Sequence, residues 1–317
     1  MSNSKILIAT YPFGLCGNEP VELLDKTGWD IKYNSMERRL KLDEVGYMLD
    51  DIDGVIAGTE PYNKDIIENT KNLKVISRVG VGLDNIDFNA CREKNIVVTY
   101  TPEAPADGVA DLAVGQMINL FRGLFLSNKS ISNKKWNRVL GSLLSEKKIG
   151  ILGVGRIGER VLKRLKGFGL QTVYCCDLKP KKLEGVKWVT KKELFSICDL
   201  VTIHIPLNKD NYHCVSLKEM GNMEKGSFII NTSRGSILDE KALEKLIYDG
   251  YIGGAALDVF EKEPYRGALT EFDNVLLTAH LGSSTHRSRF LMEYQATEDC
   301  IRVLQNKKPL RPVDEEI

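Results

Sequence analysis

The sequence predicts an α/β fold made of parallel β-sheets with helices on both faces. Three observations carry this prediction. The chain has 317 residues, which is enough for two domains that each bury a core. Short apolar runs alternate with longer amphipathic segments along the chain, as expected for strands joined by crossover helices. One apolar run leads through a glycine-rich turn directly into a helical segment, which is the local order of a βα unit.

The first α/β unit is expected to extend from residue 1 to about residue 99. Amphipathic patterns such as 64–70, with apolar Ile66 and Ile67, separate its apolar runs. Its strands are expected at 6–9, 54–57, 74–77 and 96–98.

A long helix is predicted next, at 106–127, because its apolar residues recur at intervals of three and four. Pro102 and Pro105 precede it, which is typical of a helix start. A helix with this many apolar residues belongs either in a core or at a subunit interface. The sequence alone favours the core.

The second part of the chain is predicted to contain a complete dinucleotide-binding sheet, since it has six strands with intervening helices such as 159–167 and 240–249. The strands are expected at 148–152, 171–176, 200–204, 227–231, 253–257 and 275–279. A last helical pattern begins near residue 287 and ends before Lys307-Lys308-Pro309.

Composition argues against nucleic-acid and membrane partners. Lys and Arg total 44 against 43 Asp and Glu, and the one basic cluster with an aromatic residue, 134–138, is best explained as a solvated helix face. No apolar stretch is long enough to span a bilayer, and the start of the chain does not resemble a signal peptide. The seven cysteines are scattered and include no C-x-x-C pair, so we expect reduced thiols and a cytoplasmic protein.

The glycine-rich turn, 153–158, has the G-x-G-x-x-G pattern of a dinucleotide site. Gly153 would make the tight turn, Gly155 would let the backbone approach a pyrophosphate, and Gly158 would pack the helix against the strand. Asp177 ends the next strand, where a carboxylate accepts hydrogen bonds from a ribose 2′-hydroxyl and repels a 2′-phosphate. NAD is therefore the expected cofactor. Alternatively, Asp177 caps a turn, and the nearby Lys179 could accommodate a phosphate.

Four polar residues suited to the reduction of a 2-oxo acid follow predicted strands: Arg234, Asp258, Glu263 and His280. A guanidinium binds a carboxylate bidentately, and an imidazole donates a proton near neutral pH. A carboxylate paired with that imidazole would hold its tautomer, a role that suits Glu263.

Each of these residues also has a purely structural interpretation. Arg234 could pair with Asp239, and Glu263 could be an ordinary loop carboxylate. His204 is interpreted as a structural residue or, at most, as lining the cofactor site, and His213 and His286 as surface residues.

Five segments together resemble the D-isomer-specific 2-hydroxyacid dehydrogenases, most closely their 3-phosphoglycerate dehydrogenase-like branch. The segments are 78–87, 153–158, 231–235, 256–264 and 278–285, and they occur in the family's order. The resemblance implies that Arg234, Glu263 and His280 are catalytic and that Asp258 contacts the nicotinamide carboxamide. It further implies cofactor contacts for Arg156, Ile157, Asp177, Pro206 and Thr232, and substrate-carboxylate binding by the loop Val79, Gly80 and Val81.

The resemblance also implies an architecture of two Rossmann-like domains. An NAD-binding domain, 100–288, would be inserted into a substrate domain made of 1–99 and 289–317. The helix at 106–127 would then belong to the interface of a homodimer, in place of the core position favoured above.

Several positions depart from the phosphoglycerate pattern. The early loop 58–62 carries Glu60 where a basic residue usually grips phosphate, which leaves Arg138 as a candidate phosphate ligand. Ala279 replaces a usual proline, Asn208 replaces a common threonine, and no C-terminal regulatory extension is expected. 3-Phosphoglycerate or a related acidic 2-hydroxy acid is the favoured substrate. The alternative is an NAD(H)-sensing scaffold or co-repressor, but such a protein would need no catalytic residues.

Overall fold

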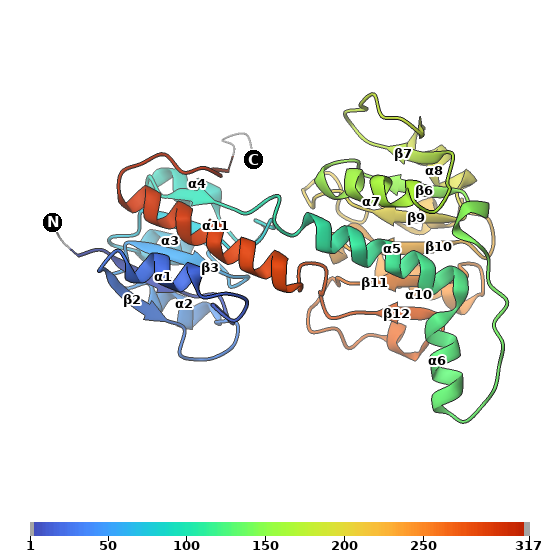
Figure 1. Ribbon diagram of the computed structural model, residues 1–317, viewed down its shortest axis with the longest axis horizontal. Helices are drawn as coiled ribbons and strands as arrows, with labels where there is room; N and C mark the ends of the chain where they lie inside the picture. Colours follow the sequence, from blue (N-terminus) through green and yellow to red (C-terminus); the bar gives the residue numbers. More distant parts are fainter. Residues whose placement is uncertain (1–2, 314–317) are drawn as a thin grey trace. The chain divides into compact units, whose positions relative to one another are not determined.

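The computed structural model describes residues 3–313 and divides into two compact units. Unit 1 comprises residues 1–105 and 283–317, and unit 2 comprises residues 106–282 (Figure 1). The chain therefore passes between the units after 105 and after 282, where the sequence suggested 99 and 288.

Unit 1 contains a parallel sheet with the strand order β2-β1-β3-β4-β5. This is the order of flavodoxin-like sheets. Its strands are β1 (Lys5–Ile8), β2 (Asp30–Tyr33), β3 (Gly54–Ala57), β4 (Val75–Arg78) and β5 (Val97–Thr99). The sequence analysis missed β2 because this edge strand is largely exposed and has no apolar run.

Helices cover both faces of the unit 1 sheet (Figure 1). Ile6 and Ile8 pack against α1 (Glu19–Asp25) and α11 (His286–Leu304) on one face. The intervening Leu7 points to the opposite face, because side chains alternate along a strand. That face is covered by α2 (Leu42–Met48), α3 (Lys64–Asn69) and α4 (Phe88–Glu93).

Unit 2 contains a longer parallel sheet with the order β12-β11-β10-β9-β6-β7-β8. Its strands are β6 (Ile149–Leu152), β7 (Val173–Cys176), β8 (Val186–Trp188), β9 (Leu200–Ile203), β10 (Phe228–Asn231), β11 (Gly254–Leu257) and β12 (Val275–Leu277). The order reverses between β6 and β9, so this pair forms the switch point at which doubly wound sheets bind ligands. The predicted six strands lacked β8, a three-residue edge strand.

Two layers of helices enclose the unit 2 sheet. On one face α5 (Ala106–Arg122) and α7 (Arg156–Lys166) pack through buried residues such as Met117 and Leu165. On the other face lie α8 (Lys191–Ile197), α9 (Leu217–Met220) and α10 (Glu240–Tyr248). Short 3₁₀ helices occur at Leu144–Glu146, Gly235–Ile237 and Ala268–Glu271. These layers bury both faces of the sheet, so its carboxyl edge is left to position side chains.

The predicted helix over 106–127 is wrong in its length. α5 ends at Arg122, and α6 (Leu124–Ser132) begins after Gly123, which has φ +59°. That left-handed backbone is easy for glycine and ends the α-helical run. Among residues 3–313 no single helix is both long and apolar enough to cross a membrane. Only α5 and α6 together meet that length and composition, and they are bent by 65°.

Candidate functional site

The candidate site lies at the carboxyl edge of the unit 2 sheet. The glycine turn follows β6, Asp177 follows β7, and Pro206 follows β9. Thr232 and Arg234 follow β10, Asp258 follows β11, and His280 comes soon after β12. Parallel strands place all their carboxyl ends on one edge, so residues far apart in the sequence meet there.

The glycine turn has the geometry expected for a dinucleotide-binding βα unit. Gly153 has φ +94° and donates its N–H to the carbonyl of Cys176 at 2.8 Å. A Cβ on Gly158 would lie 2.2 Å from the carbonyl oxygen of Gly153, so no larger residue fits where α7 crosses the turn. Both glycines are therefore required by the protein itself.

Gly155 differs because a Cβ there would meet no protein atom within 4 Å. The protein's own packing does not explain a glycine at this position, whereas the close approach of a ligand does. Gly155 is the N-cap of the eleven-residue α7, whose first N–H groups and positive dipole end favour phosphate. The turn thus fits the pyrophosphate of a dinucleotide.

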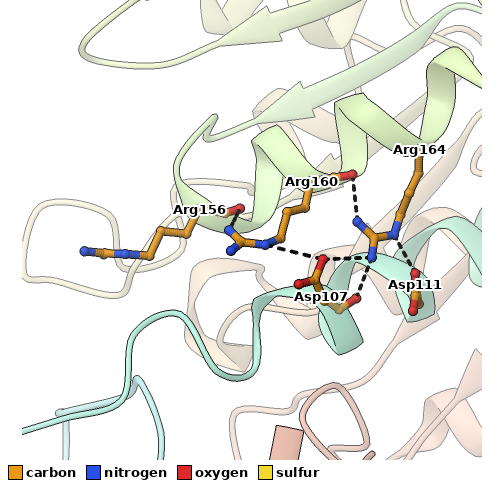
Figure 2. A network of polar contacts seen from close by, with 5 residues as sticks. All are labelled: Asp107, Asp111, Arg156, Arg160 and Arg164. Carbon is orange, nitrogen blue, oxygen red and sulfur yellow. Dashed lines mark hydrogen bonds and ion pairs between the residues drawn. The ribbon is translucent and has the colours of Figure 1, made fainter. Parts of the chain in front are cut away.

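A polar network joins α7 to α5 (Figure 2). Arg164 contacts Asp111 at 2.5 Å and Asp107 at 3.0 Å, and Arg160 contacts Asp107 at 3.4 Å. Arg160 also donates to the backbone carbonyl of Arg156, at the first residue of α7. The Arg156 side chain extends away from this network (Figure 2). The network therefore fixes α7 against α5 without using the Arg156 guanidinium that was predicted to contact the cofactor.

Asp177 is tied into the glycine turn. One carboxylate oxygen accepts the N–H of Val154 at 2.7 Å, and the other accepts the N–H of Lys179 at 2.8 Å. The capping interpretation of Asp177 is thus present in the structure. Each Asp177 oxygen can still accept a further hydrogen bond, since a carboxylate can accept about four in total.

Beside the switch point, the His204 side chain is buried and contacts two hydroxyl groups. Its ring nitrogens contact the hydroxyls of Thr202 at 3.0 Å and Thr232 at 3.4 Å, and the residue is 8% exposed. Burial lowers the pKa of His204 to about 3, so its imidazole is neutral. Pro206 is exposed two residues later, and Ile157 packs partly against the core below the turn.

The structure brings two of the three predicted catalytic residues, Glu263 and His280, into direct contact. His280 Nδ1 lies 3.0 Å from a carboxylate oxygen of Glu263, and both side chains are partly exposed. Burial alone would raise the pKa of Glu263. The hydrogen bond and charge of His280, the backbone hydrogen bond from Phe260 and the charge of Arg234 outweigh this effect, so the Glu263 pKa lies below its ordinary value. The Arg234 charge thus acts on the same carboxylate that holds His280.

Asp258 shapes the turn that carries His280. Its carboxylate accepts the Thr278 hydroxyl at 2.5 Å and the N–H groups of Leu281 and Gly282 at 2.7 and 2.8 Å. His280 has φ +54°, an unfavourable conformation for a residue with a side chain, and its N–H donates to the Asp258 carbonyl at 2.9 Å. The buried Asp258 therefore holds His280 in a strained backbone conformation, a role that the sequence did not reveal.

The sequence analysis also missed Asn231 at the end of β10. Its side chain donates to the Arg234 carbonyl at 2.9 Å and accepts the Ser233 N–H at 3.1 Å and the Ser233 hydroxyl at 2.8 Å. Asn231 therefore fixes the short loop that presents Arg234. Asparagine commonly makes such local hydrogen bonds to its own loop, and this tendency was the available signal.

In unit 1, the predicted substrate loop follows β4. Val79 donates its N–H to Ala57, and Gly80 donates to the hydroxyl of Thr101 at 2.8 Å. The N–H groups of Val79 and Gly80 therefore already have acceptors within unit 1. Val81, the third residue of the predicted substrate loop, is exposed.

Glu60, the acidic residue of the early loop 58–62, is almost fully buried in unit 1. Its carboxylate accepts the Gly58 N–H and the Tyr62 hydroxyl, each at 2.6 Å. Tyr62 is itself fully buried, and burial and the Glu60 charge raise its pKa well above the ordinary value. A carboxylate thus occupies this loop as a fixed structural element.

Arg138 lies in an exposed segment after α6. Its neighbours Val139 and Leu140 line a cavity of about 360 Å³ together with Gly226 and Gly253, which precede β10 and β11. Those glycines mark the amino edge of the sheet. Within unit 2, the structure therefore does not bring Arg138 to the edge that carries Arg234 and His280.

Comparisons with known proteins identify a family model, relatives and solved structures that are similar to this chain. Residues 114–282 match the family model described as D-isomer specific 2-hydroxyacid dehydrogenase, NAD binding domain. A hydroxypyruvate reductase of Thermotoga maritima is 34% identical over 299 residues, covering 90% of this chain and 97% of the relative. The crystal structure of a glyoxylate reductase from Paecilomyes thermophila matches with a TM-score of 0.89 and 26% identity, covering 100% of both chains.

Another relative is named for a different activity. The D-3-phosphoglycerate dehydrogenase of Methanocaldococcus jannaschii is 38% identical over 264 residues, which is 81% of this chain. The match covers only 49% of that relative's length. The relatives that are similar in sequence are therefore named for different substrates.

Proposed function

The chain belongs to the D-isomer specific 2-hydroxyacid dehydrogenase family, an NAD-binding family of oxidoreductases, and we propose that Arg234, Glu263 and His280 are its catalytic residues. The observation that carries this proposal is the 3.0 Å contact between His280 Nδ1 and Glu263, with Arg234 acting on the same carboxylate. A scaffold that only senses NAD(H) would not need this arrangement.

Each side chain has one task in the proposed mechanism. The Arg234 guanidinium binds the substrate carboxylate and orients the adjacent carbonyl. Glu263 accepts the Nδ1–H of His280, which fixes the tautomer and leaves Nε2 for the substrate. During reduction His280 gives its proton to the carbonyl oxygen, and during oxidation it removes the proton from the hydroxyl. Bound NAD(H) supplies or accepts the hydride.

The cofactor would lie along the carboxyl edge of unit 2. Its pyrophosphate would meet Gly153, Gly155, Gly158 and the first turn of α7, where Arg156 and Ile157 stand. Asp177 would accept a ribose hydroxyl and thereby favour NAD over NADP. Pro206, Thr232 and Asp258 would contribute the remaining contacts, with Asp258 directed at the nicotinamide carboxamide.

The favoured substrate is a small 2-oxo acid such as glyoxylate or hydroxypyruvate. The Thermotoga maritima relative is named a hydroxypyruvate reductase and the Paecilomyes thermophila structure is that of a glyoxylate reductase, and both match over nearly their full length. The early loop of unit 1 also holds the buried carboxylate of Glu60 instead of a cation. The loop containing Val81 would bind the substrate carboxylate. Phosphohydroxypyruvate is the second candidate, supported by the 38% identical phosphoglycerate dehydrogenase. Because Arg138 lies near the amino edge of the unit 2 sheet, we do not propose it as a phosphate ligand for the site of its own chain.

A homodimer is also part of the proposal. Large apolar side chains are exposed on α6 and the segment that follows it: Leu124, Phe125, Ile131, Trp136, Val139, Leu140 and Leu143. Exposed apolar side chains that cluster in one stretch of the sequence favour an interaction surface there. One face of α5 is already used by the core of its own unit. Light scattering should give a mass of about twice 35.6 kDa, and Trp136→Glu with Leu140→Glu should give the monomer mass.

The catalytic proposal is tested by NADH oxidation with glyoxylate, hydroxypyruvate and phosphohydroxypyruvate. We expect turnover that favours an unphosphorylated acid and a loss of catalysis in Arg234→Lys, which keeps the charge but not the bidentate geometry. Tight NADH binding with no turnover on any of these acids would instead support the sensing scaffold.

A further inference from the structure

Glu263 is carried by the segment Val259–Glu263, which leaves the sheet after Asp258. A hydrogen bond within this segment holds the Glu263 side chain: the Phe260 N–H donates to a Glu263 carboxylate oxygen at 3.1 Å. The Phe260 ring is buried in the core and stacks on Tyr265, with the ring centroids 4.3 Å apart. The position of Glu263 therefore depends on where the Phe260–Glu261 peptide is held.

Gly235 contacts one side of that peptide. A Cβ on Gly235 would lie 1.9 Å from the carbonyl carbon of Phe260 and 2.2 Å from the nitrogen of Glu261. Both are backbone atoms, which a rotamer change cannot move aside. Gly235 directly follows Arg234, so the backbone that presents the guanidinium also supports the segment that presents Glu263.

Glu240, the first residue of α10, holds the same peptide through a hydrogen bond. Its carboxylate accepts the Glu261 N–H at 2.6 Å. In return, the Glu261 carboxylate accepts the Glu240 N–H at 3.4 Å and lies 2.9 Å from His213 Nε2. Burial, the largest influence, raises the pKa of Glu240, and the charges of Glu261 and Glu263 act in the same direction. Glu240 is thus fixed close to both acidic side chains.

We propose that Gly235 and Glu240 are positioning residues for catalysis: they clamp the Phe260–Glu261 peptide so that Glu263 meets His280. The inference rests on the proposed function, because it gives Glu263 the role of orienting the imidazole. It extends that function to two residues outside the predicted catalytic and cofactor-binding set. Glu240 need not be ionised for the clamp to work, since a neutral amide oxygen accepts the same hydrogen bond.

The first experiment compares Glu240→Ala with Glu240→Gln. Alanine removes the acceptor for the Glu261 N–H, so we expect kcat to fall at least tenfold with a change in the NADH Kd of less than twofold. Glutamine keeps an acceptor oxygen at the same place and should restore kcat to within about threefold. The control is Glu193→Ala, which removes a carboxylate that accepts a backbone N–H at the start of α8, 2.8 Å away, and should leave kcat unchanged.

The second experiment compares two glycines with similar steric constraints. A Cβ on Gly253 would lie 2.3 Å from the carbonyl oxygen of Gly226, at the amino edge of the same sheet. Gly235→Ala and Gly253→Ala should both lower the melting temperature. Only Gly235→Ala should lower kcat of the folded fraction at least tenfold, with NADH binding retained.

A readout that needs no turnover separates this inference from the proposed function. Long-range ¹H–¹⁵N NMR reports the tautomer of His280, identified by the signal missing in His280→Gln. We expect Nδ1–H in the wild type and a mixed tautomer in Glu240→Ala and Gly235→Ala. An unchanged His280 tautomer, or equal effects of Glu240→Ala and Glu240→Gln, would overturn the clamp. Wild-type protein that turns over no 2-oxo acid but shows these NMR changes would overturn only the proposed function.

Discussion

Two histidines follow parallel strands of the same sheet, yet their surroundings are opposite. His204 follows β9, is 8% exposed, and its ring nitrogens contact the hydroxyls of Thr202 and Thr232. His280 follows β12 after a short turn, has a side chain 43% exposed and faces the carboxylate of Glu263. One imidazole is held neutral by burial, and the other can reach both solvent and a charged partner.

The comparison teaches that position at a strand end does not make a histidine catalytic. What differs is the accessible ring and its carboxylate neighbour, together with the strained turn that holds His280. Four predictions follow, from the largest expected effect to the smallest; the first three test this contrast, and the fourth tests the cofactor site on the same edge of the sheet.

The largest effect is expected for His280→Gln. Loss of the proton donor should lower kcat by about 10³-fold, within the range typical of general acid–base catalysis. The NADH Kd should change less than threefold, which fluorescence titration can measure. Matched losses of kcat and NADH affinity would argue against a role as proton donor. His204→Gln is the comparison variant and should keep most of the activity.

Glu263→Gln should lower kcat by about 10²-fold, because the amide no longer pairs with the charged imidazole and can present the wrong group to Nδ1. Since the Glu263 pKa lies below its ordinary value, the carboxylate is ionised throughout pH 5–9. The deficit should therefore persist across that range in a pH–rate profile. A deficit that disappears at one end would contradict the assignment.

His204 should make the protein less stable in mild acid. Its folded pKa is about 3, whereas an ordinary histidine titrates near 6.5, so between these values the unfolded chain binds the extra proton. Stability that is present above pH 6.5 is then lost as the pH falls, by about 2 kcal/mol at pH 5. Urea unfolding at pH 7 and pH 5 should show a smaller pH dependence in His204→Asn than in the wild type. An equal pH dependence in both would contradict this account.

Asp177→Ala should weaken NADH binding about tenfold and narrow the gap between NADH and NADPH, since removal of the carboxylate ends its repulsion of a 2′-phosphate. Part of the loss would come from the turn, because Asp177 also accepts the Val154 N–H. Asp177→Asn keeps an acceptor for that N–H and is therefore the control. Unchanged discrimination in both variants would remove Asp177 from the ribose site.

Much of the site was predictable because its chemistry is encoded in short segments. The turn at 153–158 has a glycine at each position where the backbone must bend or approach closely. Arg234, Glu263 and His280 could be proposed together because strand ends in a parallel sheet meet at one edge. The chemical types of these three side chains limited the possible reactions even without the distances between them.

Other features were not predictable because they depend on contacts between distant segments. The edge strands β2 and β8 lack apolar runs and exist through pairing with β1 and β7. The predicted helix over 106–127 ends early because Gly123 adopts a left-handed conformation that periodicity cannot reveal.

The sequence by itself determined the fold class, the glycine turn and the set of reactive groups, because these follow from local patterns and residue chemistry. Only the tertiary structure decided which groups act together. Asp258 proved to hold the His280 turn, and Gly235 and Glu240 proved to contact the segment that carries Glu263. The physical reason is that hydrogen bonds and steric contacts act over a few ångströms, and folding alone brings distant residues that close.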